Sequence, residues 1–173
     1  MEGFDLGYLP FVVRAWCDVS RDYPHVNASV VDDSLVVHRE LNLAVAIDLD
    51  DDGTVAPVLH GVDGMRLRLV AVALDDVAER ARSGALGPDE VEGATFTVTD
   101  MSGSGAMLTL PVIEQPQVAV LSLGAVVKSP VVVAGPGGED AIAVHHVGHL
   151  ALAWDHRAFD GATRRRSSAP SGM

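Results

Sequence analysis

Residues 154–162 read Trp-Asp-His-Arg-Ala-Phe-Asp-Gly-Ala, and this stretch carries the strongest local signal in the chain. It closes an apolar run, 149–154, that is typical of a strand, and the Asp-Gly pair at 160–161 is typical of a tight turn. The pattern predicts that His156 lies at a strand end beside that turn. Imidazole is the natural general base near neutral pH. Taken alone, however, a histidine in this setting is more often structural than catalytic.

Upstream of this stretch, two segments have the periodicity of helices. Residues 10–23 repeat apolar side chains at spacings of four, begin with a proline and stop before Pro24. Residues 67–81 carry an apolar face opposite a charged one, and Gly84 is placed to end that helix. Both segments are therefore predicted to pack one face against a core.

Most of the remaining chain has strand patterns, interspersed with the helices without strict alternation. This arrangement predicts an α+β two-layer sandwich with a mixed β-sheet packed by helices. The expected strands are 28–31 and 35–38 (as a hairpin), 43–49, 55–59, 95–99, 118–122, 125–133, 141–144 and 149–154.

Composition narrows the classes of protein to which the chain can belong. Its 173 residues, 48% hydrophobic and 21% charged, fit one globular domain. With 24 acidic against 12 basic residues the net charge is −12, which argues against a nucleic-acid partner. Cys17 is the sole cysteine, so no disulfide can form within the chain, as suits a reducing cytoplasm. The start lacks the features of a signal peptide, and no apolar run approaches the roughly 20 residues that cross a bilayer. We therefore expect a cytoplasmic protein without a membrane partner.

Several motifs together resemble one family. Residues 155–162 are similar to the D-H-R-x-x-D-G-A signature of the catalytic domain of 2-oxo acid dehydrogenase acyltransferases, the E2 or dihydrolipoamide acyltransferase subunits. This signature is a variant of the H-x-x-x-D-G motif of chloramphenicol acetyltransferases, so the resemblance implies a chloramphenicol acetyltransferase-like fold. Five further segments look like landmarks of the family in the same order, namely 11–15, 23–28, 55–58, 93–99 and 111–117.

The resemblance implies roles for three residues. His156 matches the general base that takes a proton from a thiol of dihydrolipoamide or coenzyme A, which then attacks an acyl thioester. Thr99 aligns with the hydroxyl that stabilises the oxyanion of the tetrahedral intermediate. Asp160 matches the aspartate that holds the turn and keeps the imidazole oriented. Where the family often has asparagine after the hydroxyl, this chain has Asp100, whose carboxylate would have to point away from an oxyanion.

The resemblance also implies partners and substrates. In the family the histidine and the hydroxyl come from different subunits of a trimer, so we expect a homotrimer or a larger homo-oligomer, with E1 and E3 components as possible partners. Coenzyme A or acyl-coenzyme A is the expected substrate, lipoamide would come from a lipoyl domain outside this chain, and no metal is implied. The acyl group and the assembly symmetry are not readable from the sequence.

The predicted acyltransferase domain spans residues 1–162, and 163–173, with three consecutive arginines and no apolar period, are predicted to be a disordered tail. Compared with the family pattern, the domain lacks a segment before residue 11 and a closing helix after residue 162. Two other functions remain open: a stand-alone acyltransferase that acts on a small metabolite, and a non-catalytic assembly subunit.

Other residue patterns that could suggest a metal, phosphate or nucleophile site are expected to be structural. The histidines at 145, 146 and 149 invite a metal hypothesis, but on a strand His145 and His149 would share one face while His146 points to the other, so structural histidines are favoured. The acidic run 50–52 lacks the spacing of a calcium loop and is expected to be a solvated turn. The small-residue loop 102–105 lacks the lysine of a phosphate-binding loop and is expected to be a flexible turn, and its Ser104 lacks a nucleophile frame. Cys17 is expected to be buried and inert.

Overall fold

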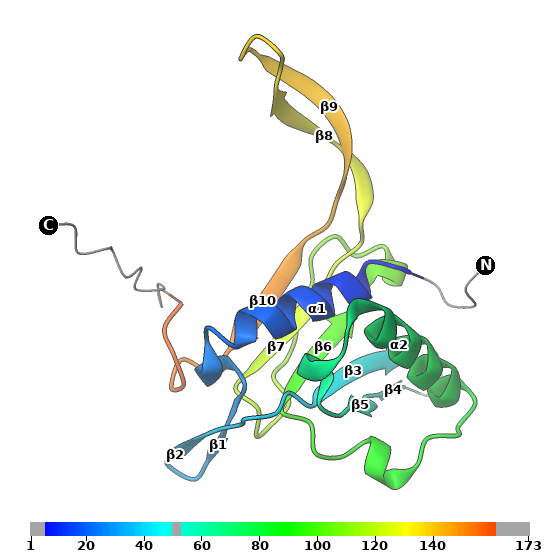
Figure 1. Ribbon diagram of the computed structural model, residues 1–173, viewed down its shortest axis with the longest axis vertical. Coiled ribbons are helices and arrows are strands. Elements are labelled where there is room, and N and C mark those ends of the chain that lie inside the picture. Colours follow the sequence, from blue (N-terminus) through cyan, green and yellow to red (C-terminus); the bar gives the residue numbers. More distant parts are fainter. Residues whose placement is uncertain (1–5, 50–52, 162–173) are drawn as a thin grey trace, which may run out of the picture.

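A mixed β-sheet with helices on one face forms the body of the protein, in a computed structural model that describes residues 6–49 and 53–161 (Figure 1). In spatial order its strands are β10 (Leu150–Trp154), β7 (Ala119–Leu123), β6 (Phe96–Asp100), β3 (Leu43–Asp48) and β4 (Thr54–Val55), and β5 (Val58–Leu59) also pairs with β3. The central strands β3, β6 and β7 are parallel, whereas β10, β4 and β5 run antiparallel to their neighbours. The predicted fold class is therefore confirmed.

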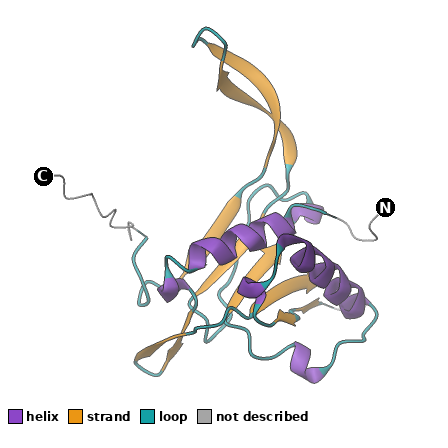
Figure 2. Ribbon diagram, viewed as in Figure 1, coloured by secondary structure: helices purple, strands orange, loops and turns teal. Residues whose placement is uncertain are grey.

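Two α-helices, α1 (Leu9–Ser20) and α2 (Leu67–Arg82), cover one face of the sheet (Figure 2). Trp16 of α1 stacks on Phe96 of β6 with ring centroids 4.2 Å apart, and Val70 and Leu74 of α2 are buried in the same core. This core has the aromatic and aliphatic side chains that the two helical periodicities predicted. Short 3₁₀ turns connect the elements, namely η1 (Pro24–Val26), η3 (Val62–Gly64), η4 (Pro88–Glu90) and η5 (Ser102–Ser104).

The first helix ends earlier than its sequence pattern predicted. Helix was expected to Tyr23, but α1 stops at Ser20. Tyr23 has φ −131° and ψ 65°, outside the helical region. A residue before proline is pushed out of the helical conformation by the proline ring, so Pro24 acts on the turn that precedes it.

The strand predicted at 55–59 is two short strands instead of one. β4 and β5 are separated by Ala56 and Pro57, and both pair with β3. Pro57 has no N–H to donate to a ladder, but its carbonyl accepts a hydrogen bond from Val45 N at 2.9 Å. The proline therefore keeps this edge close to β3 while it interrupts the regular pairing.

Two hairpins lie outside the main sheet. The predicted hairpin of β1 (Ala28–Val31) and β2 (Ser34–Val37) is confirmed, with Asp32 at φ +53° in its turn. β8 (Val127–Ala134) and β9 (Asp140–Val147) pair along their full lengths and project away from the sheet (Figure 1). This second hairpin begins where β7 ends and returns the chain to β10.

The histidines at 145, 146 and 149 do not lie on one strand, so the condition under which His145 and His149 would share a face is not met. β9 extends past the predicted end at residue 144 to Val147 and includes His145 and His146, and His149 lies just before β10. Directly after β9, Gly148 packs so closely against the Val126 side chain that a Cβ there would lie 2.9 Å from it. In the part of the chain that the structure describes, no group of three His, Cys, Asp or Glu side chains could hold a metal ion.

Some predictions fall outside the described residues, namely the tail 163–173 and the acidic run 50–52. Within the described ranges, none of the helices has the length and apolar character needed to cross a membrane.

Candidate active site

His156 lies in the loop that follows β10, at one end of the sheet. The backbone N–H of Asp155 donates to the carbonyl of Val118 at 2.7 Å, which ties the loop to the start of β7. The Arg157 guanidinium donates from Nε to Asp155 Oδ1 at 3.1 Å and from Nη2 to Asp155 Oδ2 at 2.7 Å, and these hydrogen bonds lower the pKa of that carboxyl. The predicted position of the imidazole at a strand end is confirmed, and the turn there is closed by a hydrogen bond from the Ala158 backbone N–H to the Asp155 carbonyl at 2.9 Å, so that it contains His156.

The imidazole of His156 faces a carboxylate from the same loop. Asp160 Oδ1 lies 3.4 Å from His156 Nδ1, and both side chains are largely exposed, 71% and 84%. A carboxylate beside Nδ1 favours the tautomer with the proton on that nitrogen, which leaves the Nε2 lone pair available to accept a proton. The Trp154 ring lies 5.4 Å from the imidazole, so the loop gives His156 one acidic and one aromatic neighbour.

Thr99 lies near the C-terminal end of β6, half-buried. Its partner in register on β7 is Ser122, and the Ser122 hydroxyl is hydrogen-bonded to the hydroxyl of Thr109. In the part of the chain that the structure describes, the Thr99 hydroxyl itself makes no side-chain hydrogen bond and can therefore donate to a bound oxygen. Sequence reasoning missed Thr109 and Ser122, because no periodicity indicates which hydroxyls meet across two strands.

His156 and Thr99 lie at opposite ends of the sheet. Thr99 of β6 pairs with Ser122 of β7, and Ser122 pairs with Ala151 of β10, so Thr99 and Ala151 lie at the same height in the sheet. From Ala151, β10 continues for three residues to Trp154, and His156 lies beyond its end. Three residues of strand are about 10 Å, and β6 is two strand spacings of about 4.8 Å from β10. The two side chains are therefore on the order of 15 Å apart within one chain, too far to act on one carbonyl carbon.

Asp100 points away from Thr99, as an oxyanion at Thr99 would require. Successive side chains on a strand alternate between its faces. Phe96 is four residues before Asp100 on β6, so the two side chains lie on the same face of the sheet. Phe96 packs on Trp16 of α1, so this is the helix-covered face, and Thr99 lies on the other. Consistently, Asp100 lines a cleft with residues of both helices, including Leu9 and Leu74.

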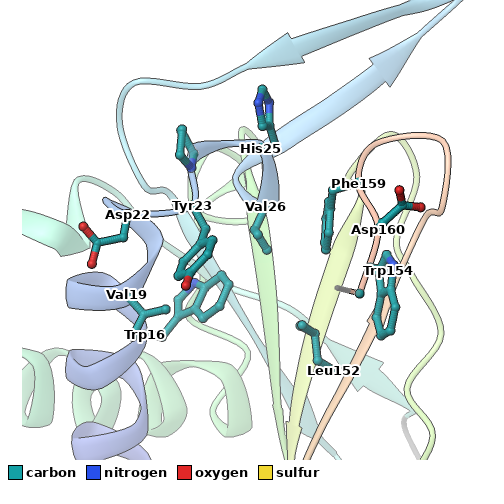
Figure 3. A pocket seen from close by; sticks show the side chains of 12 residues that line it. Trp16, Val19, Asp22, Tyr23, His25, Val26, Leu152, Trp154, Phe159 and Asp160 are labelled. Atoms are coloured by element: carbon teal, nitrogen blue, oxygen red, sulfur yellow. The ribbon is translucent and has the colours of Figure 1, made fainter. Parts of the chain in front are cut away.

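An apolar cleft of about 430 Å³ lies behind the His156 loop (Figure 3). One wall carries Trp16 and Tyr23, and the other carries Trp154 and Phe159, which stack on each other. Asp160 stands at its rim, on the wall of Trp154 and Phe159 (Figure 3). The sequence patterns did not predict this cleft, because its walls come from segments more than a hundred positions apart in the chain.

Comparison with known proteins gives a consistent result. The sequence profile of the 2-oxoacid dehydrogenases acyltransferase (catalytic domain) family matches residues 2–169. The chain is 40% identical over 167 residues to the dihydrolipoyllysine-residue acetyltransferase component of the pyruvate dehydrogenase complex of Mycobacterium tuberculosis, a match that covers 95% of this chain and 30% of that protein.

Solved structures agree with the sequence comparison. A probable dihydrolipoamide acetyltransferase from Listeria monocytogenes matches with a TM-score of 0.84 and 31% identity, over 92% of this chain and 66% of that one. A dihydrolipoamide acetyltransferase from Azotobacter vinelandii matches with a TM-score of 0.81 and 30% identity, over 92% and 64%. That structure comes from an investigation of a serine, a histidine and an asparagine in the catalytic mechanism, of which the last two are four positions apart, like His156 and Asp160. The cubic core of a pyruvate dehydrogenase multienzyme complex matches with a TM-score of 0.81 and 29% identity, over 92% and 64%. The chain thus spans about a third of the length of the curated relative and about two thirds of the solved chains.

Proposed function

The chain belongs to the 2-oxoacid dehydrogenase acyltransferase family, and on that premise we propose that it transfers an acyl group between coenzyme A and a dihydrolipoamide thiol. The observation that carries the proposal is the exposed His156 imidazole beside Asp160, in the loop that matches the family signature. We propose His156 as the general base, Thr99 as the oxyanion donor and Asp160 as the residue that orients the imidazole. Both substrates are thiols or thioesters, so the reaction needs no metal.

In the proposed mechanism His156 Nε2 takes the proton of the attacking thiol. The thiolate adds to the thioester carbonyl, and the carbonyl oxygen becomes the oxyanion of a tetrahedral intermediate. A hydroxyl donor at that oxygen stabilises the charge as it develops. Collapse of the intermediate expels the other thiolate, which recovers the proton from the imidazolium, so the acid and base roles of His156 balance over one turnover.

A second copy of the chain has to complete this site. Since His156 and Thr99 are about 15 Å apart within one chain, the histidine of one copy would work with the threonine of another. The structural likeness to a cubic pyruvate dehydrogenase core supports a homo-oligomer. A trimer or larger shell, associated with E1 and E3 components in the cytoplasm and supplied with lipoamide by a separate lipoyl domain, is part of the same proposal.

The surface that we propose for the second copy lies at the Thr99 end of the sheet. The β8–β9 hairpin starts there, and its cross-strand pair Val132 and Ile142 is 69% and 79% exposed. In the segment after Thr109, Leu110 and Val112 are more than 80% exposed. Large apolar side chains exposed together are typical of a contact surface between subunits.

The first test is acyl transfer from acetyl-, succinyl- and isobutyryl-coenzyme A to free dihydrolipoamide. We expect His156→Ala to lower kcat by roughly 100-fold or more, because it removes the general base. Thr99→Val should also lower kcat by roughly 100-fold, because it removes one oxyanion donor. Turnover that survives both substitutions would contradict the proposal.

Co-assembly of the two inactive variants tests whether the site is shared. In a random mixture of His156→Ala and Thr99→Val copies, roughly a quarter of the interfaces pair an intact histidine with an intact threonine, and we expect about that share of wild-type turnover. No recovery would mean that each chain builds its own site. A folded assembly without turnover on any donor would instead favour a small-metabolite acceptor or a non-catalytic assembly subunit.

A further inference from the structure

The end of β6 passes directly into a turn that has hydrogen bonds of its own and one bond to β7, from the Met101 backbone N–H to the Leu123 carbonyl at 2.8 Å. Asp100 Oδ1 accepts from the backbone N–H of Ser102 at 2.9 Å, which places Ser102 at the start of η5. The Ser104 hydroxyl donates to the Met101 carbonyl at 2.8 Å, and Gly105 has φ +75°, a conformation that glycine adopts without strain. The expected turn is therefore present, and the Asp100 carboxylate accepts the first of its side-chain hydrogen bonds.

The segment that follows this turn lies against the end of β7. Beyond it, the Ala106 carbonyl accepts from the backbone N–H of Ala125 at 2.8 Å. The Met107 backbone passes so close to Gly124 that a Cβ on Gly124 would be 2.3 Å from the Met107 carbonyl oxygen. Residues 106 and 107 are thus held against the chain that follows β7.

The same segment forms a wall beside Thr99. Thr109 is hydrogen-bonded to Ser122, and Ser122 is the partner of Thr99 in register, on the face of the sheet away from the helices. Adjacent parallel strands are about 4.8 Å apart, so Thr109 is a near neighbour of the Thr99 hydroxyl. A shift of the turn would move this wall and leave Thr99 itself in place.

We propose that Asp100 is a positioning residue for the Thr99 site. Its carboxylate faces away from the oxyanion and acts through the turn, which lays residues 106–109 beside Thr99. The inference rests on the proposed function of Thr99. It assigns a constructive role to a residue at which the sequence differs from the asparagine that the family often has after the hydroxyl. An aspartate does this work as well as an asparagine, because both side chains present an oxygen that can accept from the backbone N–H two residues on.

The experiment compares substitutions that disturb the turn from both sides. Asp100→Ala removes the acceptor, and Gly124→Ala pushes the wall from the opposite side. Because a displacement of about 1 Å can cost roughly 100-fold in rate, we expect either substitution to lower kcat by roughly 10- to 100-fold with KM nearly unchanged. Asp100→Asn keeps the acceptor and should retain kcat within about threefold. Gly103→Ala is the matched control, since a Cβ there meets nothing within 4 Å and Gly103 lacks a positive φ, so kcat should not change.

Amide hydrogen exchange provides a readout that does not need turnover. The Ser102 and Ala125 amides should exchange slowly in the wild type and in Asp100→Asn, and faster in Asp100→Ala. Equal loss of kcat in Asp100→Asn and Asp100→Ala would overturn the proposal, because the charge would then matter and not the acceptor. Unchanged exchange in Asp100→Ala would overturn it too. If the wild type transfers no acyl group, the proposed function fails, while exchange still decides whether Asp100 holds the segment.

Discussion

Cys17 is a buried thiol on the core side of α1, as its sequence position predicted. Burial raises its pKa to about 11, so little thiolate is present near neutral pH. Because the thiolate is the reactive form, we expect iodoacetamide at pH 8 to label the native protein at least about 100-fold more slowly than the urea-unfolded protein. As the chain has one cysteine, mass spectrometry reads this site alone. Rapid labelling of the folded protein would show that α1 detaches from the sheet.

The same thiol makes stability depend on pH in alkaline solution. Its pKa of about 11 when folded exceeds the value of 9.0 expected for a free thiol, so the contribution is complete below pH 9 and is lost as pH rises to 11. Over that interval the unfolding free energy of the wild type should fall by about 2 to 3 kcal/mol more than that of Cys17→Ala. Urea titrations at pH 8, 9, 10 and 11 measure the difference, and parallel curves would contradict it.

At the scale of elements, Arg14 joins α1 to the turn that precedes α2. Nη1 of its guanidinium donates to the backbone carbonyls of Met65 at 2.7 Å and Asp63 at 3.2 Å, and Nη2 donates to Asp18 Oδ1 at 2.6 Å. We expect Arg14→Met to lower the unfolding free energy by about 2 to 3 kcal/mol, because two half-buried carbonyls lose a charged donor. Asp18→Ala removes only the exposed ion pair and should leave stability close to the wild type. Equal losses in the two variants, measured by urea unfolding, would contradict this reading.

The local signals in the sequence predicted most elements but not their partners. The apolar period of α2 and the Ala28–Val31 hairpin strand were predicted with nearly the observed bounds, since both depend on neighbouring residues. The predicted strand 125–133 exists with a small shift, as β8, yet nothing in its composition distinguishes a strand of the main sheet from one of a projecting hairpin. Pro24 and Pro57 changed two further elements through the restrictions that a proline ring places on its neighbours.

At the scale of the whole molecule, the sequence identified the candidate residues of the site but not their separation. Motif matching selected His156, Thr99 and Asp160, and the last of these lies beside the first because both belong to one short loop. The distance between His156 and Thr99 follows instead from the pairing of β6, β7 and β10, which no local pattern encodes. Their roles stay predictions until the two variants are assayed.

The projecting hairpin provides a test of assembly. Ile142 and Val144 lie on one exposed face of β9, and aspartates there would have to be buried at the proposed contact without a partner. We expect Ile142→Asp with Val144→Asp to reduce the assembly to monomers in sedimentation velocity, with the secondary structure unchanged. Leu69→Asp is the matched control, because Leu69 is an exposed apolar residue on α2, away from the hairpin. Loss of assembly in the control, or its survival in the double variant, would exclude the hairpin as the contact.

The cleft behind the His156 loop has an optical consequence. The protein has two tryptophans, and both line that cleft, one on each wall. Light emitted on excitation at 295 nm therefore originates entirely from this one place, and each indole N–H there is buried without a hydrogen-bond partner among residues 6–49 and 53–161. An oxygen that approached either N–H would shift the emission towards longer wavelengths, whereas an apolar group that displaced water from the walls would shift it towards shorter ones. The protein thus carries its own fluorescent reporter for whatever enters the space beside its proposed catalytic base.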